Sequence, residues 1–338
     1  MLLQLFLTPK VAHMAISQPT PGDMTTRAEM KRIFGGGDQG GIAPSATTPN
    51  VLIYTDPKTG EQSGYFDGWL PEEDDRGPLF VYTGHGQDEQ TFVGSKGNGN
   101  RAILHHVDDG RALHVFKAVG TVPGSGTKQQ RYIGEFELDA KQPYVLLYLP
   151  NRAGVPRRVI MFRLRPSGPY ERRPKDVTPA ASKTEAVTVP ADVTESKIVE
   201  PETSRKTQSS RSAVPQTTVQ RREARLSDDF QAFLESKQHH VRRFQINVKG
   251  LSSPLRTDLY DLTAHVLYEI KGTTSRESVR MAIGELLDYC RHVTPVDPVL
   301  AVLLPVKPHN DLRELLATTD IALVYREGET FIGWPVKA

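Results

Sequence analysis

The residues best suited to catalysis lie in the C-terminal half of the chain, where Asp258 is followed by Glu269 and Lys271. They are expected on two short strands joined by a turn. Alternation along the second strand puts Glu269 and Lys271 on one face, while Ile270 points into the core. Two carboxylates beside a lysine can hold a divalent metal ion, and the lysine can orient a water molecule or stabilise charge on a phosphate. The segment therefore predicts phosphodiester hydrolysis, against the simpler interpretation of a hairpin with solvated charges.

The elements that must position these residues follow one another as helix, three strands, helix, strand, helix and strand. Ser227 is a candidate cap for the first helix, and the second helix begins at about Ser275. Such an order predicts a small mixed sheet with helices packed on its faces. The expected elements are a helix carrying Leu226, Phe230, Phe233 and Leu234, a strand over 243–248, the hairpin, a helix from 275 whose apolar stripe reaches Cys290, a strand over 299–304, a helix over 311–316 and a strand over 321–325.

This order of elements, with its acidic residue and its Glu-x-Lys, resembles the PD-(D/E)XK restriction-endonuclease superfamily. The resemblance implies that Asp258 and Glu269 are the ligands of Mg²⁺, with Mn²⁺ as a substitute, and that Lys271 belongs to the set that activates water. Asp261, three residues further along and expected in the turn, competes with Asp258 for the role of metal ligand.

The following helix reads Ala282-Ile283-Gly284-Glu285-Leu286-Leu287-Asp288-Tyr289, and related nucleases often have Gln at the position of Glu285. Glu285 is included among the catalytic residues because it lies one turn from Tyr289, so that both can face the cleft. Glu in place of Gln predicts altered metal binding or a lower rate, without loss of the metal ligands. An acidic residue of the first helix sometimes joins such a site, and three candidates remain open: Glu223, Asp228 and Asp229.

The N-terminal half, from about residue 30 to 166, is rich in glycine, aromatic residues and short alternating runs. Turn signals such as Asp108-Asp109-Gly110 separate the runs, a pattern typical of a β-rich barrel or sandwich. A helix is expected from Asn100 to His106. The candidate strands cover residues 51–54, 79–82, 112–117, 132–138, 144–148 and 159–164.

Four motifs follow one another in this half. They are Gly64-Tyr65-Phe66-Asp67-Gly68-Trp69, Phe80-Val81-Tyr82-Thr83-Gly84-His85-Gly86-Gln87, Gly99-Asn100-Arg101-Ala102-Ile103-Leu104 and Asp109-Gly110-Arg111-Ala112-Leu113-His114-Val115-Phe116. Their order resembles the SRA domain, a PUA-like barrel that flips and reads 5-methylcytosine or 5-hydroxymethylcytosine, and is similar to prokaryotic members fused to nucleases. The resemblance implies that the partner is double-stranded DNA containing a modified cytosine.

A pocket for a flipped cytosine needs aromatic faces for stacking, an acceptor for the exocyclic amine and room beside C5. A carboxylate is the natural acceptor for that amine, which points to Asp67. Three other acids precede the Tyr-Thr-Gly and compete with it: Glu73, Asp74 and Asp75. The expected pocket comprises Tyr65, Trp69 and Tyr82 for stacking, Asp67 for the amine, and Thr83 and Gly84 for backbone contacts. Packing in a β-core is the competing interpretation of the aromatic residues.

Polar and basic residues of the same half are expected to line a DNA groove, although solvated surface would account for them as well. They are His85, Lys96, Arg101, Lys128 and Arg131. The glycine-rich run over 34–41 lacks the Gly-Lys-Ser/Thr of a nucleotide-binding loop and is expected to approach the DNA backbone or to form a plain turn.

Between the two halves the composition changes abruptly. From Glu171 to Asp229 there is no aromatic residue and no glycine, and no leucine before Leu226. A segment so poor in apolar groups cannot offset the entropy of folding and is expected to be a disordered linker, which would allow cleavage at variable distances. The expected division is an N-terminal extension without fixed structure over 1–29, an SRA-like domain over 30–166, a disordered linker over 167–225 and a nuclease domain over 226–338.

The composition limits the class of protein. A chain of 338 residues is long enough for two domains, and a formal net charge of +2 does not by itself indicate nucleic-acid binding. The single cysteine, Cys290, excludes a disulfide framework and a cysteine-rich zinc site, and its apolar stripe predicts a buried thiol. The apolar N-terminus is too short to span a membrane and lacks the basic region of a signal peptide, so no membrane partner and a cytoplasmic, prokaryotic location are expected.

Two functions are consistent with these residues. The first is a type IV-like, modification-dependent restriction endonuclease that flips a modified cytosine and hydrolyses DNA nearby with Mg²⁺. Since one such site cuts one strand, a double-strand break would require a homodimer or a larger assembly. The second is a non-cleaving reader whose degenerate nuclease domain serves assembly. A modified adenine and a sulfur-modified backbone remain alternative targets.

Overall fold

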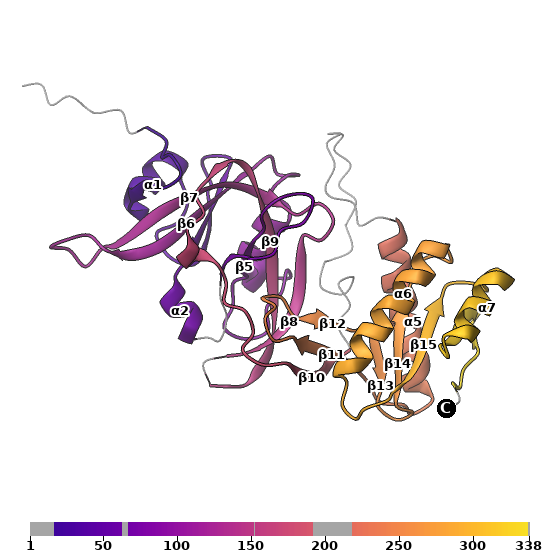
Figure 1. Ribbon diagram of the computed structural model, residues 1–338. Coiled ribbons are helices and arrows are strands. Elements are labelled where there is room, and N and C mark those ends of the chain that lie inside the picture. Colours follow the sequence, from indigo (N-terminus) through magenta and orange to yellow (C-terminus); the bar gives the residue numbers. More distant parts are fainter. Residues whose placement is uncertain (1–16, 63–66, 152, 192–217, 337–338) are drawn as a thin grey trace, which may run out of the picture.

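The computed structural model describes residues 17–62, 67–151, 153–191 and 218–336. Its strands form two sheets, one in each half of the chain, and the halves lie side by side as two domains (Figure 1). The expected combination of a β-rich domain and a mixed sheet flanked by helices is therefore confirmed. Among the helices of the described ranges, none is long and apolar enough to cross a membrane.

The N-terminal domain is built on one sheet. Its strands are β1 (Met24–Thr25), β2 (Ile42–Pro44), β3 (Asn50–Thr55), β4 (Gly68–Trp69), β5 (Phe80–Thr83), β6 (Ala112–Thr121), β7 (Lys128–Leu138), β8 (Tyr144–Pro150) and β9 (Pro156–Tyr170). They are ordered β2-β3-β6-β7-β9-β5-β4, with β1 beside β7 and β8 beside β9. Its helices are α1 (Arg27–Phe34), α2 (Pro57–Gln62) and α3 (Asn98–Leu104), with the 3₁₀ turns η1 (Ser95–Gly97) and η2 (Pro174–Asp176). Each strand expected from the alternating runs is present.

Strand β3 shows why this sheet is covered on both faces. Its side chains alternate, so Val51 and Ile53 join the core around Trp69, whereas Leu52 joins the core beneath α1. Helix α1 supplies Phe34 to that second core, and burying such a side chain contributes about 1.5–3 kcal/mol. The helix starts at a capping box in which the Thr26 side chain accepts from the backbone of the third helical residue.

The C-terminal domain is a mixed sheet with helices on both faces. Its strands are β10 (Glu185–Pro190), β11 (Val241–Asn247), β12 (Leu255–Arg256), β13 (Leu259–Asp261), β14 (Val266–Ile270), β15 (Val299–Leu304), β16 (Ala322–Glu327) and β17 (Thr330–Ile332). They are ordered β10-β11-β13-β14-β15-β16-β17, with β12 beside β11. The helices are α5 (Thr218–Ser236), α6 (Arg276–Tyr289) and α7 (Asn310–Thr318), with the 3₁₀ turn η3 (Cys290–His292).

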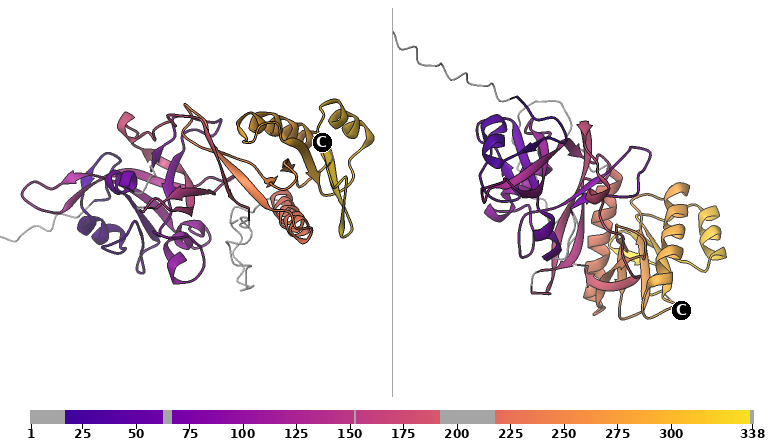
Figure 2. Two further views of the ribbon diagram at one scale, coloured as in Figure 1. Left: turned by 90° about the horizontal axis from the view of Figure 1, so that it is seen from below. Right: turned by 60° about the vertical axis from the view of Figure 1, so that its left-hand side comes forward.

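The two faces of β14 pack on different helices. Tyr268 and Ile270 pack with Phe230 of α5, whereas Leu267 packs with residues of α6 and α7. Figure 2 shows α5 on one side of the sheet and α6 and α7 on the other. Strand alternation therefore directs Glu269, two residues after Leu267, to the face that α6 covers. Helix α6 begins where expected, and Ser275 caps it by accepting from Ser278 N–H. The expectation of a buried thiol is not met, since Cys290 follows the end of α6 and is only half-buried.

Much of the expected disordered linker over 167–225 is ordered. Strand β9 extends to Tyr170, β10 pairs with β11 along its whole length, and α5 begins at Thr218. Composition gave no sign of β10 because an edge strand is held by backbone hydrogen bonds and needs few apolar side chains, here Val189. Ser227, expected as a helix cap, lies inside α5. Residues 192–217 lie outside the described residues.

The expected extension over 1–29 is part of the domain from at least Gly22 onward, because its N–H donates to Tyr132 O and the Tyr132 N–H donates to Asp23 O. Strand β1 then pairs with β7. Backbone pairing, which has no side-chain signature, again decided this boundary. Residues 1–16 lie outside the described part of the chain.

The domains meet where the side chain of Gln245 on β11 contacts the backbone of β8. Its Oε1 accepts from Tyr148 N–H at 2.8 Å, and its Nε2 donates to Tyr148 O at 3.0 Å. The chain passes from one domain to the other between β9 and β10, within residues 171–184 that the structure describes. The described connection between the two sheets is therefore short, and the premise of a long tether is not met, while cleavage at variable distances stays a prediction without that premise.

Candidate functional site

The hairpin of β13 and β14 brings Asp258 and Glu269 together. Asp258 lies immediately before β13, and the register pairs Leu259 with Tyr268 on β14. Asp258 Oδ2 accepts from the N–H of Ile270 at 2.7 Å, which fixes its carboxylate beside the strand that carries Glu269. Because Glu269 is only 4% exposed, little water is available to solvate a second negative charge.

Lys271 connects the acidic residues on this face. Its Nζ donates to Glu269 Oε1 at 2.7 Å and forms a second ion pair with Glu285 of α6. Burial lowers the pKa of Lys271, but the negative charge of Glu269 and its hydrogen bond outweigh burial and raise that pKa above its ordinary value. Burial, followed by the charge of Asp258, raises the pKa of Glu269. Lys271 therefore stays charged among carboxylates that repel one another.

A third acid reaches the site from α5. Glu223 Oε2 accepts from Gly272 N–H at 3.1 Å, and burial, then the charge of Asp258, raises the pKa of Glu223 to about 7. A Cβ on Gly272 would lie 2.2 Å from Val219 O, so only glycine allows α5 this close. Of the three acids that the sequence left open, Glu223 lies at the site, whereas Asp229 pairs with Arg326 at 2.5 Å.

Asp261, the competing ligand, has a different role. It is fully buried, and its Oδ1 accepts from Thr263 N–H at 2.9 Å while its Oδ2 contacts His239 Nδ1 at 2.5 Å. These bonds close the turn and join it to the start of β11. Asp261 therefore stabilises the hairpin, and Asp258 is the residue placed beside Glu269.

The acidic residues of the site offer a small set of oxygen donors for a divalent cation. Among the described residues, no group of three or more His, Cys, Asp or Glu side chains is arranged to hold a metal ion. Asp258 and Glu269 offer carboxylate oxygens, which Mg²⁺ prefers with water completing its coordination. The raised pKa values of Glu269 and Glu223 have crowded negative charge as a cause, which a cation would relieve. The residues therefore fit Mg²⁺ held by two carboxylates.

Tyr289 shares the cleft with Glu285, as their spacing of one helical turn predicts. Burial, followed by the charges of Glu269 and Glu285, raises the pKa of Tyr289 above its ordinary value. Its phenol therefore stays protonated at neutral pH and can donate a hydrogen bond into the cleft.

In the N-terminal domain, Asp67 has an environment of its own. It precedes β4, its Oδ1 accepts from Thr83 N–H at 2.7 Å, and its Oδ2 accepts from Thr55 Oγ1 at 2.9 Å. Burial raises the pKa of Asp67 to about 6, although both hydrogen bonds act to lower it. Among the described residues, no cationic side chain is hydrogen-bonded to Asp67. Its carboxylate can therefore still accept a hydrogen bond from a ligand.

Two of the three rival acids are engaged elsewhere. Asp74 pairs with Arg165 at 2.6 Å, and Glu73 pairs with Arg172. Hydrogen bonds from Arg165 and from the Arg76 N–H lower the pKa of Asp74 to about 2. Asp75 is exposed, and Asp67 is the acid that accepts from the Tyr-Thr-Gly segment, at the N–H of Thr83.

Two parts of the expected base pocket are different in the structure. Trp69 is 0% exposed and packs on Phe80 and Phe136 in the core, so it offers no face for stacking. Gly84 N–H donates to Ile160 O at 2.7 Å and is used by the sheet. Core packing, the competing interpretation, therefore holds for Trp69. Tyr82 lies on β5 and is buried, and Tyr65 lies outside the described residues.

A residue that the sequence reasoning missed is Arg27, on α1. Its guanidinium lies 3.8 Å from the centre of the Tyr54 ring, a cation–π contact, and its charge interacts with Tyr82. The capping box that starts α1, Thr26 with Glu29, was a readable signal for this helix. The sequence analysis did not predict α1 because residues 1–29 were expected to form an extension without fixed structure.

The residues expected in a DNA groove divide into two groups. Arg131 is 0% exposed and pairs with Asp176 and Glu171, so it is a structural ion-pair residue and cannot line a groove. Arg101 donates to the Phe92 carbonyl at 2.5 Å and lines the cleft between the domains. The other three residues, His85, Lys96 and Lys128, are exposed. Lys128 forms an ion pair with Asp56.

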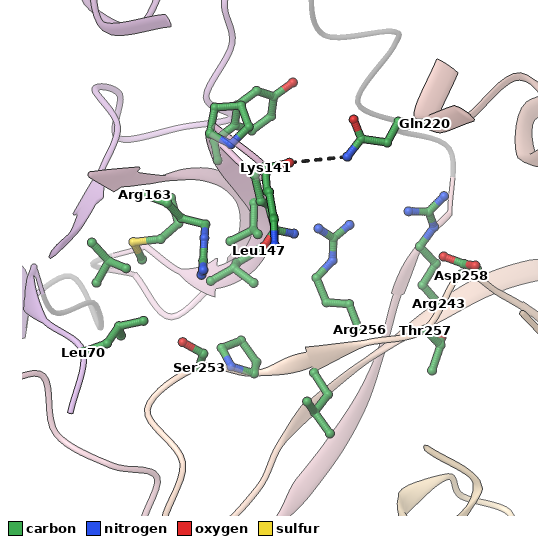
Figure 3. Close-up of a pocket in the computed structure, with 18 of the residues that line it drawn as sticks. Leu70, Lys141, Leu147, Arg163, Gln220, Arg243, Ser253, Arg256, Thr257 and Asp258 are labelled. Atoms are coloured by element: carbon green, nitrogen blue, oxygen red, sulfur yellow. Dashed lines mark hydrogen bonds between the residues drawn. The ribbon is translucent and has the colours of Figure 1, made fainter. Parts of the chain in front are cut away.

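A cleft of about 2250 Å³ lies between the domains and reaches the acidic site. Both domains line it, and in Figure 3 Arg163 and Lys141 extend from one wall while Arg243, Arg256 and Asp258 lie on the other. The acidic site thus opens on a space that the N-terminal domain helps to enclose.

Residues 21–185 match the family model for the SRA domain of ScoMcrA-like proteins. This match confirms the resemblance drawn from the four N-terminal motifs. No curated protein matches the chain.

Solved structures with low similarity include the type IV phosphorothioation-dependent restriction endonuclease ScoMcrA, with 22% identity over 46% of this chain and 29% of that chain and a TM-score of 0.33. The sulfur-binding and SRA domains of ScoMcrA with phosphorothioated DNA show 24% identity over 47% and 44%, with a TM-score of 0.32. The DNA recognition domain of the cytosine modification-dependent restriction endonuclease LpnPI shows 14% identity over 43% and 69%, with a TM-score of 0.30. This chain thus spans less than half the length of the first two.

Proposed function

We propose, from the premise that residues 21–185 are an SRA domain of the ScoMcrA type, that the protein is a modification-dependent DNA endonuclease. The SRA domain would bind DNA at a flipped, modified cytosine, and the C-terminal domain, a PD-(D/E)XK-type nuclease, would hydrolyse a phosphodiester bond nearby. The observation that carries the proposal is the placing of Asp258, Glu269 and Lys271 at one end of a hairpin that opens on the interdomain cleft.

The recognition step is assigned to Asp67. Its carboxylate accepts from Thr83 N–H and from Thr55, which holds it in a fixed direction beside β5. The N4 amine of cytosine is a donor that a carboxylate accepts well. We assign 5-methylcytosine or 5-hydroxymethylcytosine as the target, with Tyr82 and Tyr65 as candidates for stacking.

The catalytic step is assigned to the hairpin and its neighbours. Asp258 and Glu269 would hold Mg²⁺, and the bound ion supplies activation of water and charge neutralisation on the leaving oxygen. Lys271, which stays charged, can donate to a phosphate oxygen. Glu223, whose pKa lies at about 7, can hold or release a proton at its carboxylate near neutral pH. Cutting both strands would require two such sites and hence a homodimer or two bound copies.

A second candidate function, a reader that does not cleave, is favoured by one observation. Lys271 Nζ is bound to Glu269 and Glu285 together, so that both carboxylates compete with any phosphate for the ammonium group. In this function the C-terminal domain would serve assembly on modified DNA.

The test incubates the purified full chain and Mg²⁺ with matched duplexes that are unmodified or carry 5-methylcytosine, 5-hydroxymethylcytosine, N6-methyladenine or a phosphorothioate. Lys271→Ala should abolish cutting, whereas Lys237→Ala, an exposed lysine over the Phe233 ring at the other end of α5, should not. Cutting only of DNA with modified cytosine supports the endonuclease. Selective binding without cutting by the intact protein supports the reader, and equal treatment of all duplexes overturns both.

A further inference from the structure

The wall of the interdomain cleft carries cations whose hydrogen-bonding capacity the protein does not use. Strand β9 contributes Arg163 from the SRA domain, and β11 contributes Arg243 from the C-terminal domain. The two side chains come from residues far apart in the sequence and extend into one space (Figure 3). The cleft therefore has a basic group on each side.

Arg163 is half-buried, and its Nε is enclosed without a hydrogen-bond partner among the described residues. Burial lowers the pKa of Arg163, although the charge of Asp139 opposes this effect. Asp139 is already bound by Arg165 at 2.7 Å and by Arg76. The nearby acid is thus occupied, and Arg163 keeps its donors for something that enters the cleft.

Arg243 repeats this arrangement on the opposite wall. It is half-buried, and its Nε also has no hydrogen-bond partner in the described part of the chain. Figure 3 shows it beside Asp258, with Arg256 extending into the cleft from the neighbouring strand. Among the described residues the protein supplies no acceptor for this Nε, although a buried donor normally has one, and the half-buried side chain lines the cleft.

The chemistry of these groups selects the ligand. Guanidinium forms short, paired hydrogen bonds with phosphate oxygens, and its geometry suits the non-bridging oxygens of a phosphodiester. Phosphates recur along each DNA strand, so one strand can contact basic residues on two walls. Phosphate contacts position the nucleic acid without reading its sequence.

We propose that the interdomain cleft binds the DNA backbone between the modified base and the bond to be cut, with Arg163 and Arg243 each contacting a phosphate. The inference rests on the proposed function and identifies the surface that links its two steps. The contacts between Gln245 and Tyr148, at 2.8 and 3.0 Å, hold the walls together, so one strand can meet both without a change of domain arrangement.

The test measures affinity for a modified and an unmodified duplex by fluorescence anisotropy in EDTA, where cleavage cannot occur, over a range of salt concentrations. Arg163→Gln and Arg243→Gln should each weaken binding to both duplexes by roughly tenfold. Each should also reduce the slope of log affinity against log salt by about 1. Arg163→Lys and Arg243→Lys, which keep the charge, should retain the slope and control for folding. Arg313→Gln, an exposed arginine of α7 that bonds Asn310, is the matched control and should change neither quantity.

The outcomes separate this inference from the proposed function. Unchanged slopes in both glutamine variants overturn the phosphate surface, even when the wild type prefers modified DNA and cuts it. A wild type without preference for any modification removes the proposed function, while reduced slopes in the variants still support the surface. Loss of affinity only for the modified duplex would place these arginines in base reading and would also overturn the inference.

Discussion

Replacing Asp67 by Asn should stabilise the protein while abolishing the preference for modified cytosine that we propose for it. The carboxyl is held where burial raises its pKa from 3.8 to about 6, so ionising it costs free energy in the folded state. Asn can still accept from the Thr83 N–H through its carbonyl, and its amide can donate to the Thr55 hydroxyl. The substitution therefore removes the charge and keeps the hydrogen bonds.

The expected size follows from the shift. Each unit of pKa corresponds to about 1.36 kcal/mol, so the rise in the pKa of Asp67 amounts to a free energy of roughly 3 kcal/mol as an upper limit. Because Asp67 keeps partial contact with solvent, we expect a gain of about 1–3 kcal/mol at pH 8. A raised carboxyl pKa means that the folded state binds more protons, so this cost grows as pH rises from 3.8 through about 6. The gain in Asp67→Asn should therefore shrink to roughly half at pH 5.

The assay is urea unfolding of the full chain, followed by tryptophan fluorescence. The chain has two tryptophans, and Trp334→Phe leaves Trp69 as the only one. Trp69 is fully buried two residues from Asp67, so its emission reports on the SRA domain. Asp139→Asn is the matched control with the opposite sign. Although burial raises the pKa of Asp139, its hydrogen bonds with Gln142 and Arg165 lower it overall, so that variant should be destabilised.

Lower stability of Asp67→Asn than of wild type at pH 8 would refute the reasoning, because Asp67 would then be a structural acceptor. An unchanged preference for modified over unmodified duplex in anisotropy would refute the assignment of Asp67 to the base. Gain of stability with loss of preference is the expected pair of results, and neither follows from the other.

Three further outcomes are expected. The affinity for Mg²⁺ should rise with pH through about 7 as Glu223 ionises, because a charged carboxylate near Asp258 attracts the cation, and Glu223→Gln should flatten that rise; an unaltered rise in calorimetric titrations with Mg²⁺ would exclude Glu223. Gln245→Ala, which removes both bonds to Tyr148, should broaden the positions of cleavage in end-labelled modified DNA, and an unchanged pattern would show that other contacts hold the domains. Arg131→Ala should lower stability by up to about 3–5 kcal/mol, because it removes the partner of Glu171 and leaves the buried carboxylate of Asp176 with Lys117 alone. If that variant instead unfolds normally but loses DNA affinity, the structural role is wrong.

Local periodicity was sufficient to predict which side chains of the β13–β14 hairpin share a face. The two-residue repeat of a strand fixed Glu269 and Lys271 on one face, and the helical repeat put Glu285 and Tyr289 on another face directed at the same cleft. Both depend only on backbone geometry within one element. The same holds for the strands of the N-terminal half and for the start of α6 near Ser275.

Other features depended on contacts between residues far apart in the chain. In the sequence, Arg131 looks like any surface arginine, and only the fold shows that it pairs with Asp176 and Glu171. In the same way, only the fold shows that Trp69 packs on Phe136 and does not line a pocket. Strand β10 exists because β11 offers a free edge, which composition does not reveal.

The sequence by itself determined which residues could share a face: Asp258 before one strand, Glu269 and Lys271 at the end of the next. Only the tertiary structure decided that Glu223 joins them, because its approach depends on Gly272 leaving room for α5. It also decided that the site opens towards the SRA domain, since hydrogen bonds such as those of Gln245 and Gln220 join the two domains. Periodicity acts within an element, whereas burial and the distance between elements are set by how they pack.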